Sequence, residues 1–216
     1  MMPAGLARFI SVIFQPLLLS CYGVLLLLNS ETWMAYTVFP QLKNALYIVV
    51  VISTFLLPAL TVLMFLQRGT ISSLEMRERK ERNWPYITTM LFYIAGWFLL
   101  NKLPLPRIFG NIVMGAGLAI LIAFLVNLRW KISIHMMGLG GLAGMLFAIA
   151  TLYNFDLAIP LMLIIAAAGL TGTARLALDA HTPAQVYVGF VAGFFLEWVF
   201  VYIYNIGPAI FEIINV

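Results

Sequence analysis

The chain carries little charge. Of its 216 residues, 9% are Asp, Glu, Lys or Arg, whereas 63% are hydrophobic. A soluble domain carries roughly a quarter charged residues, so this composition excludes a soluble fold and is typical of a polytopic membrane protein. The net charge of +4 comes mostly from one loop, which argues against nucleic acid as a partner. We therefore expect the partners to be membrane lipids.

Cysteine and histidine are also scarce. The single cysteine, Cys21, excludes an internal disulfide and any metal cluster built on cysteine. There are two histidines, His135 and His181, and no cluster of carboxylates and histidines with metal-ligand spacing accompanies them. We therefore expect neither a metal ion nor a cofactor.

Long apolar stretches dominate what is present. Most of them approach the ~20 residues that a membrane-spanning helix needs, although the third and the fifth are short. Prolines inside such helices, such as Pro16 and Pro58, are tolerated and often produce kinks. We predict an all-α integral membrane protein, a bundle of six to seven transmembrane helices. The stretches are Phe9–Leu28, Ala45–Leu66, Tyr86–Leu100, Ile108–Leu128, Met136–Leu152, Leu157–Thr173 and Val186–Ile206.

No internal repeat and no separate soluble domain is evident. The organisation that we expect is two N-terminal transmembrane helices in residues 1–66, followed by a transmembrane core in residues 67–216. Within the core, Gly140, Gly141 and Gly144 favour close helix contact rather than a phosphate-binding loop.

The polar loops alternate in character along the chain. If the spans are counted, the N-terminus and the loops Gln67–Pro85, Arg129–His135 and Ala174–Gln185 emerge on one face. The positive-inside rule makes that face cytoplasmic, and we expect the bacterial inner membrane. The opposite face holds only Lys43, Lys102 and Arg107. The first face holds Arg8, Arg68, Arg77, Arg79, Lys80, Arg82, Arg129, Lys131 and Arg175.

The stretch Ala174–Gln185 gathers polar residues between two apolar runs. Thr182 suits a helix N-cap, Pro183 suits the first helical position, and Gln185 falls where a capping box places Glu or Gln. His181 then stands just before a helix N-terminus, where free backbone N–H groups favour an anion. Arg175 adds a cation suited to phosphate. This pattern predicts an anion site at the membrane surface.

The basic loop before the third apolar stretch has two interpretations. Glu75 with Arg79, and Glu78 with Arg82, stand at i,i+4 spacing, which favours a solvated helical turn. Alternatively, the cations cluster around phosphate while Trp84 and Tyr86 anchor the chain at the lipid headgroups. The sequence leaves both open.

Two spacings carry a resemblance. Arg175 precedes His181 with five residues between them, three residues then separate His181 from Gln185, and the segment Val186–Gly189 follows. Upstream, Ser133-Ile134-His135 places a serine two residues before a histidine. These features resemble the type-2 phosphatidic acid phosphatase family of membrane lipid phosphatases, which includes haloperoxidase-like enzymes. That family combines Lys, six residues and Arg-Pro with Pro-Ser-Gly-His and with Ser-Arg, five residues, His, three residues and Asp.

The resemblance covers roughly Arg77 to the C-terminus and is weakest in the first motif. There Pro85 is present, Arg77 stands for the lysine and Trp84 for the arginine, while Lys80 and Arg82 are nearby cations that can substitute. The resemblance implies phosphoryl transfer from a lipid or isoprenoid phosphate.

The family also implies a role for each matched residue. His181 would attack phosphorus and form a phosphohistidine, and His135 would protonate the leaving alkoxide. Gln185 would orient His181. The residues that would hold the phosphate oxygens are Arg175, Ser133, Lys80, Arg82 and Arg77.

Several positions depart from the family pattern. Gln185 replaces an aspartate and brings no charge to the nucleophilic histidine, and Asp179 is the nearby carboxylate that could substitute. Ala174 lacks a hydroxyl, and Ile134 lacks the freedom of glycine. We expect a phosphatase that these departures weaken. The alternatives are a non-catalytic binder, sensor or transporter of anionic lipid, and a structural membrane subunit.

Two further carboxylates have simpler interpretations. Glu197 lies within the last apolar stretch, and we expect it to pair with another polar residue inside the bundle. Asp156 lies in a short turn and suits a helix N-cap.

Overall fold

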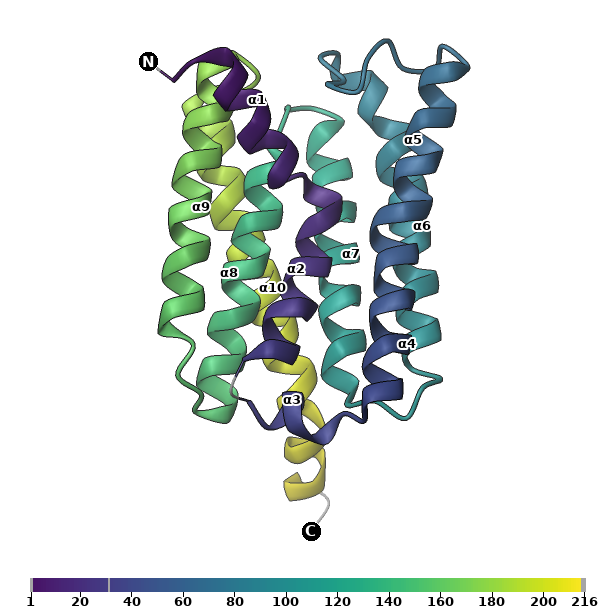
Figure 1. Cartoon of the computed structure of the whole chain (residues 1–216), viewed down its shortest axis with the longest axis vertical. Helices are drawn as coiled ribbons and strands as arrows, with labels where there is room; N and C mark the ends of the chain where they lie inside the picture. Colours follow the sequence, from purple (N-terminus) through teal and green to yellow (C-terminus); the bar gives the residue numbers. More distant parts are fainter. Residues whose placement is uncertain (1, 31, 215–216) are drawn as a thin grey trace.

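The computed structural model describes residues 2–30 and 32–214, with the side chains of residues 33, 34 and 206–214 left out. All the regular secondary structure of these residues is helical, so the predicted all-α membrane bundle is confirmed. The rods run side by side along the long axis of the molecule (Figure 1). The helices are α1 (Ala4–Ile13), α2 (Pro16–Asn29), α3 (Trp33–Thr37), α4 (Pro40–Val50), α5 (Leu57–Gln67), α6 (Asn83–Leu100), α7 (Arg107–Asn127), α8 (Ile134–Tyr153), α9 (Ala158–Ala177) and α10 (Pro183–Ile214), with a π-helix Val51–Leu56 and a 3-10 turn Arg79–Arg82.

Within the described residues, 5 helices are long and apolar enough to cross a membrane, or 6 if a bent pair counts as one span. The helix α6, of 18 residues, lies beside α7 but is not one of these crossing helices. Each predicted apolar stretch falls mostly on one or more of the helices α1 to α10. The crossing helices are Pro40–Gln67, Arg107–Asn127, Ile134–Tyr153, Ala158–Ala177 and Pro183–Asn205.

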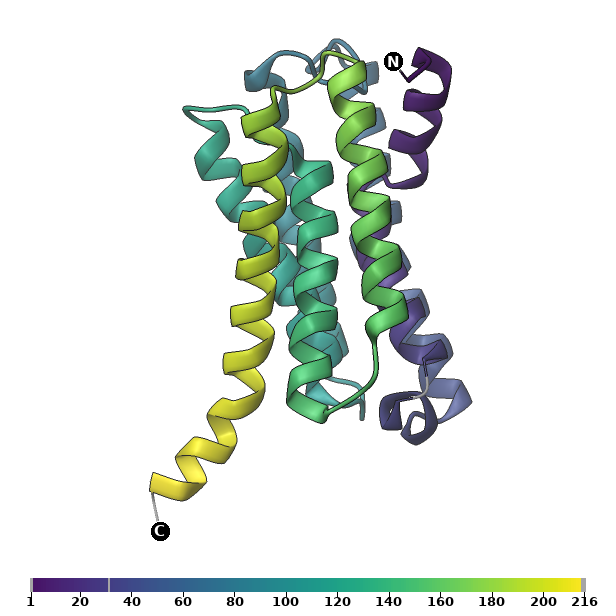
Figure 2. The same ribbon diagram turned by 90° about the vertical axis from the view of Figure 1, so that its left-hand side faces the viewer.

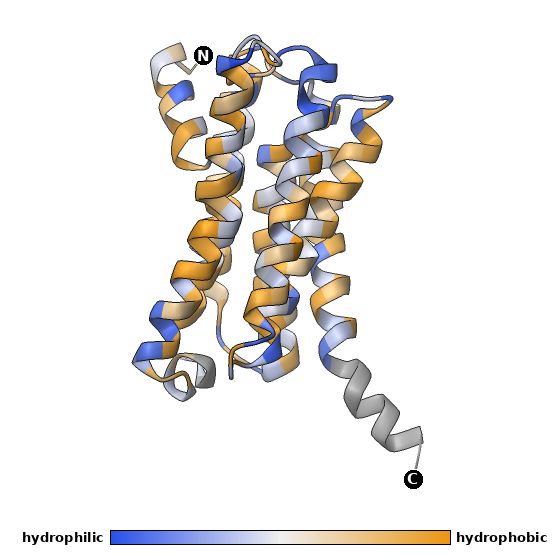
Figure 3. Ribbon diagram, turned by 90° about the vertical axis from the view of Figure 1, so that its right-hand side faces the viewer, coloured by the Kyte–Doolittle hydropathy of each residue, from blue (hydrophilic) through white to orange (hydrophobic). Residues whose placement is uncertain are grey.

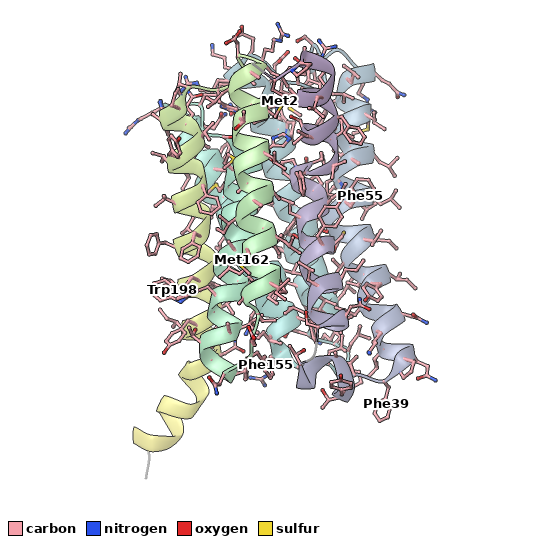
Figure 4. All side chains as sticks on the ribbon, turned by 60° about the vertical axis from the view of Figure 1, so that its left-hand side comes forward. Met2, Phe39, Phe55, Phe155, Met162 and Trp198 are labelled. Carbon is pink, nitrogen blue, oxygen red and sulfur yellow. The ribbon has the colours of Figure 1, made fainter. Side chains whose placement is uncertain are left out.

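The distribution of hydropathy along the rods agrees with a membrane environment. Apolar residues colour the middle of the bundle, whereas hydrophilic residues gather at its two ends (Figure 3). Large apolar side chains also project outward from the rods, among them Met162, which is 62% exposed (Figure 4). Lipid chains cover such a surface at no cost, because no backbone polar group is left unpaired along a helix.

The first predicted span is broken rather than continuous. Phe9–Leu28 folds as α1 and α2, which meet at an angle of 54°. Pro16 occupies the first turn of α2, and the side chain of Gln15 accepts a hydrogen bond from the backbone N–H of Leu17 at 3.0 Å. Proline has no N–H to continue α1 and fits the start of a new helix, so the chain turns there.

Glycines permit the closest helix pair, α8 with α10. A Cβ atom added at Gly140 or Gly144 would collide with the backbone oxygen of Phe190 or Phe194, and one at Gly193 would collide with that of Met137. Figure 2 shows the two helices lying side by side. The predicted packing role of Gly140 and Gly144 is therefore confirmed.

The polar loops gather at one end of the bundle. The N-terminal helix begins there, and the connections α5–α6, α7–α8 and α9–α10 all return to it (Figure 1). The N-terminal segment is part of this arrangement, because α1 packs against α9 and α2 against α8. The end that carries these loops is called the loop end below.

Candidate functional site

A cavity of about 610 Å³ extends from the loop end into the bundle. Its wall includes residues from α1, α2, α5, α6, α7, α8, α9 and α10. It collects several of the polar residues that the sequence singles out, although they are far apart along the chain. Those that matter here are Arg8, Arg82, His135, Arg175, His181 and Glu197.

His181 lies in this wall, in the turn before α10. Its imidazole Nδ1 lies 2.9 Å from Oε1 of Gln185, and the same oxygen accepts a hydrogen bond from the backbone N–H of Thr182 at 3.2 Å. A backbone N–H can only donate, so the amide atom between them is the oxygen. Nδ1 of His181 therefore carries the proton. Nε2 keeps its lone pair, and it has no hydrogen-bond partner among the described residues.

The surroundings of His181 keep the ring neutral. Burial lowers the pKa of His181 to about 3, the hydrogen bond to Gln185 opposes this, and the charges of Arg82, Arg175 and Lys131 lower it further. A neutral imidazole with Nδ1–H is the form whose Nε2 can act as a nucleophile.

The first turn of α10 forms the predicted capping box. The backbone N–H of Gln185 donates to Oγ1 of Thr182 at 3.4 Å, while Oε1 of Gln185 accepts from the N–H of Thr182. The prediction for these residues is confirmed. In addition, the backbone N–H of Ser133 donates to the carbonyl oxygen of Gln185 at 3.3 Å, which joins the start of α8 to the start of α10.

Arg175 is buried at the C-terminal end of α9, with 8% of its surface exposed. Its Nη1 donates to Oγ of Ser11 at 3.3 Å, while its buried Nε has no partner among the described residues. A buried guanidinium with an unused donor in a cavity wall is suited to an anionic ligand.

Arg82 is the buried cation of the basic loop. Its Nε donates to the carbonyl oxygen of Met76 at 3.0 Å and its Nη1 to that of Ile132 at 3.4 Å. Lys131 stands nearby, and its pKa is lowered by partial burial and by the charges of Arg82 and Arg175. At the loop end, the cavity wall holds Arg8, Arg82 and Arg175 against the carboxylate of Glu75, so its net charge is positive and favours an anion.

His135 occupies the first turn of α8 in the same wall. Its Nε2 lies 3.2 Å from the backbone carbonyl oxygen of Ser11, which can only accept, so Nε2 carries the proton. Ser11 thus contacts both His135 and Arg175, the latter through its hydroxyl.

Other predicted phosphate ligands lie outside the cavity wall. Ser133 is fully buried, and its Oγ has no partner among the described residues. Lys80 is exposed. Arg77 is also exposed and pairs with Glu75, its Nε lying 3.0 Å from Oε2. The structure therefore brings Arg82, rather than Arg77 or Lys80, to the site.

Both interpretations of the basic loop need correction. The segment before Arg79 is irregular, and only Arg79–Arg82 forms a 3-10 turn, so the helical i,i+4 pairing of Glu75 with Arg79 is wrong. Trp84 is 58% exposed, but Tyr86 is only 7% exposed and faces the cavity rather than the headgroups.

The remaining carboxylates also differ from one another. The prediction that Asp156 is a helix N-cap is wrong by one residue: the N-cap of α9 is Leu157, and Asp156 before it accepts a hydrogen bond from the N–H of Ala158 at 3.1 Å. Asp179 is exposed and does not reach His181. The expectation that Glu197 pairs with a polar residue is wrong. It is 3% exposed, and neither carboxylate oxygen has a hydrogen-bond partner among the described residues.

Three residues line the cavity that the sequence did not predict there: Ser11, Arg8, and Tyr86, which was expected at the lipid headgroups. Arg8 was counted only as a surface cation. Ser11 gave no signal, because a serine in an apolar stretch usually bonds to its own helix, as Ser11 also does through Ala7 at 2.9 Å. The break before Pro16 was the feature that could have indicated a separate α1.

No group of three or more His, Cys, Asp and Glu side chains that could hold a metal ion occurs in the described part of the chain. The chain matches no protein-family model, no curated protein and no solved structure.

Proposed function

We propose that this protein is an integral membrane phosphatase of the lipid phosphatase type. It would bind a lipid or isoprenoid phosphate in the cavity and transfer the phosphoryl group through His181. The observation that carries the proposal is the pairing of a neutral His181, whose Nε2 is free, with the unpartnered Nε of buried Arg175 in one cavity wall. The first provides a nucleophile and the second a positive charge for the phosphate oxygens.

The chemistry follows from the positions of these groups. Nε2 of His181 forms a bond to phosphorus while the bond from phosphorus to the lipid oxygen breaks. His135 would first take up a second ring proton when the phosphate binds, then donate a proton to that oxygen and return to the neutral ring that bonds to the carbonyl oxygen of Ser11. Water then attacks the phosphohistidine, and inorganic phosphate leaves. Arg175 and Arg82 neutralise the charge on the transferring group.

The experiment is a phosphate-release assay in detergent over a panel of lipid monophosphates. The wild type is compared with His181→Asn, which removes the nucleophile, and with Lys80→Asn, which removes an exposed cation outside the cavity. We expect release by the wild type and by Lys80→Asn and none by His181→Asn. Equal release by the wild type and His181→Asn on every substrate would contradict the proposal.

A second candidate is a non-catalytic binder, sensor or transporter of anionic lipid. One observation favours it: Gln185 brings no negative charge to stabilise the imidazolium character that develops as His181 attacks. Binding of lipid phosphate without release, in the wild type and in all variants, would identify this function. In either case we propose the bacterial inner membrane, with the cation-rich loop end in the cytoplasm.

A further inference from the structure

The deep part of the cavity is a second polar environment, separate from the cationic loop end. Glu197 of α10 lines it, as do Ser20 of α2 and Tyr93 of α6. Gly141 of α8 borders Glu197, because a Cβ atom added there would lie 3.8 Å from the Cβ of Glu197. Gly141 is six residues beyond His135, which corresponds to ~9 Å along the helix. This deep part of the cavity, called the cavity floor below, therefore lies well inside the bundle.

Glu197 is built into this floor without a partner. It is 3% exposed, and both of its carboxylate oxygens lack a hydrogen bond among the described residues. A Cβ atom at Gly115 of α7 would lie 2.6 Å from Oε2 of Glu197, so a glycine there leaves the carboxyl group its space. A carboxyl group in a membrane interior is costly unless something bonds to it. A ligand in the cavity is the available source of that bond.

The neighbouring polar groups narrow the ligand chemistry. Oγ of Ser20 and the hydroxyl of Tyr93 lie 3.1 Å apart and bond to each other, and neither carboxylate oxygen of Glu197 has a partner among the described residues. The rest of the wall at this depth is apolar, with Ile112, Leu142 and Met145. An apolar wall suits a hydrocarbon chain. A hydroxyl group on that chain can donate to a carboxylate, or exchange hydrogen bonds with a neutral carboxylic acid.

We infer that the cavity floor is a second binding site, in which Glu197 takes a hydroxyl group carried on the hydrocarbon portion of a lipid ligand. The inference deepens the proposed function, since the phosphate of the same lipid would lie at His181. It also stands apart from catalysis, because it concerns binding at the floor alone.

The test measures affinity rather than turnover. Lysophosphatidic acids whose acyl chains carry a hydroxyl at successive positions are compared with the unsubstituted chain. The protein is the His181→Asn variant in detergent, so that the ligand is not hydrolysed. The matching unphosphorylated monoacylglycerols form a second series. We expect one hydroxyl position to bind ~10-fold more tightly than the plain chain in both series, a gain in the range of one hydrogen bond to a carboxyl group.

Two variants assign the effect to Glu197. In the same His181→Asn background, Glu197→Gln keeps a hydrogen-bonding amide and should keep most of the preference, whereas Glu197→Leu should abolish it, so that hydroxylated and plain chains bind equally. If no hydroxyl position is preferred, or if the preference survives in Glu197→Leu, the inference is overturned. A third probe carries an ammonium group in place of the preferred hydroxyl. Tighter binding of this ammonium chain than of the hydroxylated chain would also overturn the inference. If only the proposed phosphate site is wrong, the monoacylglycerols, which have no phosphate, will still show the preference for one hydroxyl position.

Discussion

A single oxygen atom of Gln185 serves the fold and the site together. It accepts from the N–H of Thr182 as part of the helix cap and from Nδ1 of His181 as the orienting group. The first contact fixes the amide orientation, and the second then fixes the tautomer of the histidine. A capping glutamine therefore performs the orienting part of the role of an aspartate, without its charge.

Restoring that charge should increase activity. Gln185→Glu keeps the length of the side chain, so both contacts remain while a negative charge is added beside Nδ1. Replacement of the orienting aspartate by asparagine in a serine protease costs ~10⁴ in rate, and we expect a gain of ~10-fold or more here. Phosphate release per enzyme is the measurement. Gln185→Met, which cannot accept either bond, is the control and should lose activity; a Glu variant no faster than wild type would contradict the orienting role.

The suppressed pKa of His181 predicts a pH dependence of stability. The folded protein holds this group neutral to about pH 3, whereas the unfolded chain takes up the proton near the ordinary value of 6.5. Because the unfolded state then binds more protons, folded-state stability falls as the pH drops from 6.5 toward 3. In His181→Asn this contribution is absent. The free energy of unfolding of the wild type should therefore decline relative to that of the variant by up to about 1.4 kcal/mol per pH unit, and its Tm should fall with it.

Thermal unfolding in detergent at several pH values gives the comparison. A Tm difference between wild type and His181→Asn that stays constant from pH 7 to pH 4 would show that His181 titrates normally in the folded protein.

Helix contacts set the spacing of the site. The interlocked glycines of α8 and α10 let Ser133 reach the carbonyl oxygen of Gln185, which brings the elements that carry His135 and His181 together. The glycines in the sequence predicted a close contact between this helix and another one. They did not indicate the partner helix, because a glycine specifies close approach but not which backbone approaches.

The glycine contact can be tested with a matched pair of variants. Gly144→Ala places a methyl group against the backbone oxygen of Phe194, whereas Gly169→Ala on α9 meets nothing within 4 Å. Both gain the same helix propensity, ~1 kcal/mol. We expect Gly144→Ala to be less stable than Gly169→Ala by ~1–3 kcal/mol, from overpacking. Equal Tm values would contradict the role of Gly144 in packing.

The bend between α1 and α2 shows what the sequence could and could not predict about an element. Pro16 indicated a kink. Nothing local indicated that the kink would direct α1 onto α9 and place Ser11 against His135 and Arg175. Those contacts are tertiary, between residues more than a hundred positions apart, so periodicity and capping rules carry no information about them.

At the scale of the whole molecule, the lengths of the apolar stretches predicted the bundle and its helices well, because a membrane-crossing chain has to satisfy its backbone within each helix. The number of crossings between them also predicted that the polar loops lie at one end of the bundle, as they do (Figure 1). Burial of individual side chains was harder to predict: Arg82 is buried and Lys80 is exposed, although both were expected to bind phosphate. The lack of a partner for Glu197 also arises only from the packed bundle.

The orientation in the membrane is the whole-molecule prediction. In a Cys21→Ser background, single cysteines are introduced at exposed positions Glu78, Arg129 and Lys102. A membrane-impermeant maleimide should label Glu78→Cys and Arg129→Cys from the cytoplasmic side and Lys102→Cys from the outside, because cations favour the cytoplasm. Labelling of Glu78→Cys and Arg129→Cys from opposite sides would contradict the bundle, and labelling of both from outside would reverse its orientation.

The central claim is that His181 carries the phosphoryl group during turnover, and a covalent intermediate tests it most directly. Wild type is mixed with ³²P-labelled lipid phosphate, quenched in alkali at millisecond to second times, and analysed for label on the protein. The prediction is a label that survives alkali, is lost in acid as a phosphohistidine is, and is absent from His181→Asn. Phosphate release by a wild type that never carries this label, or an equal label on His181→Asn, would contradict the account.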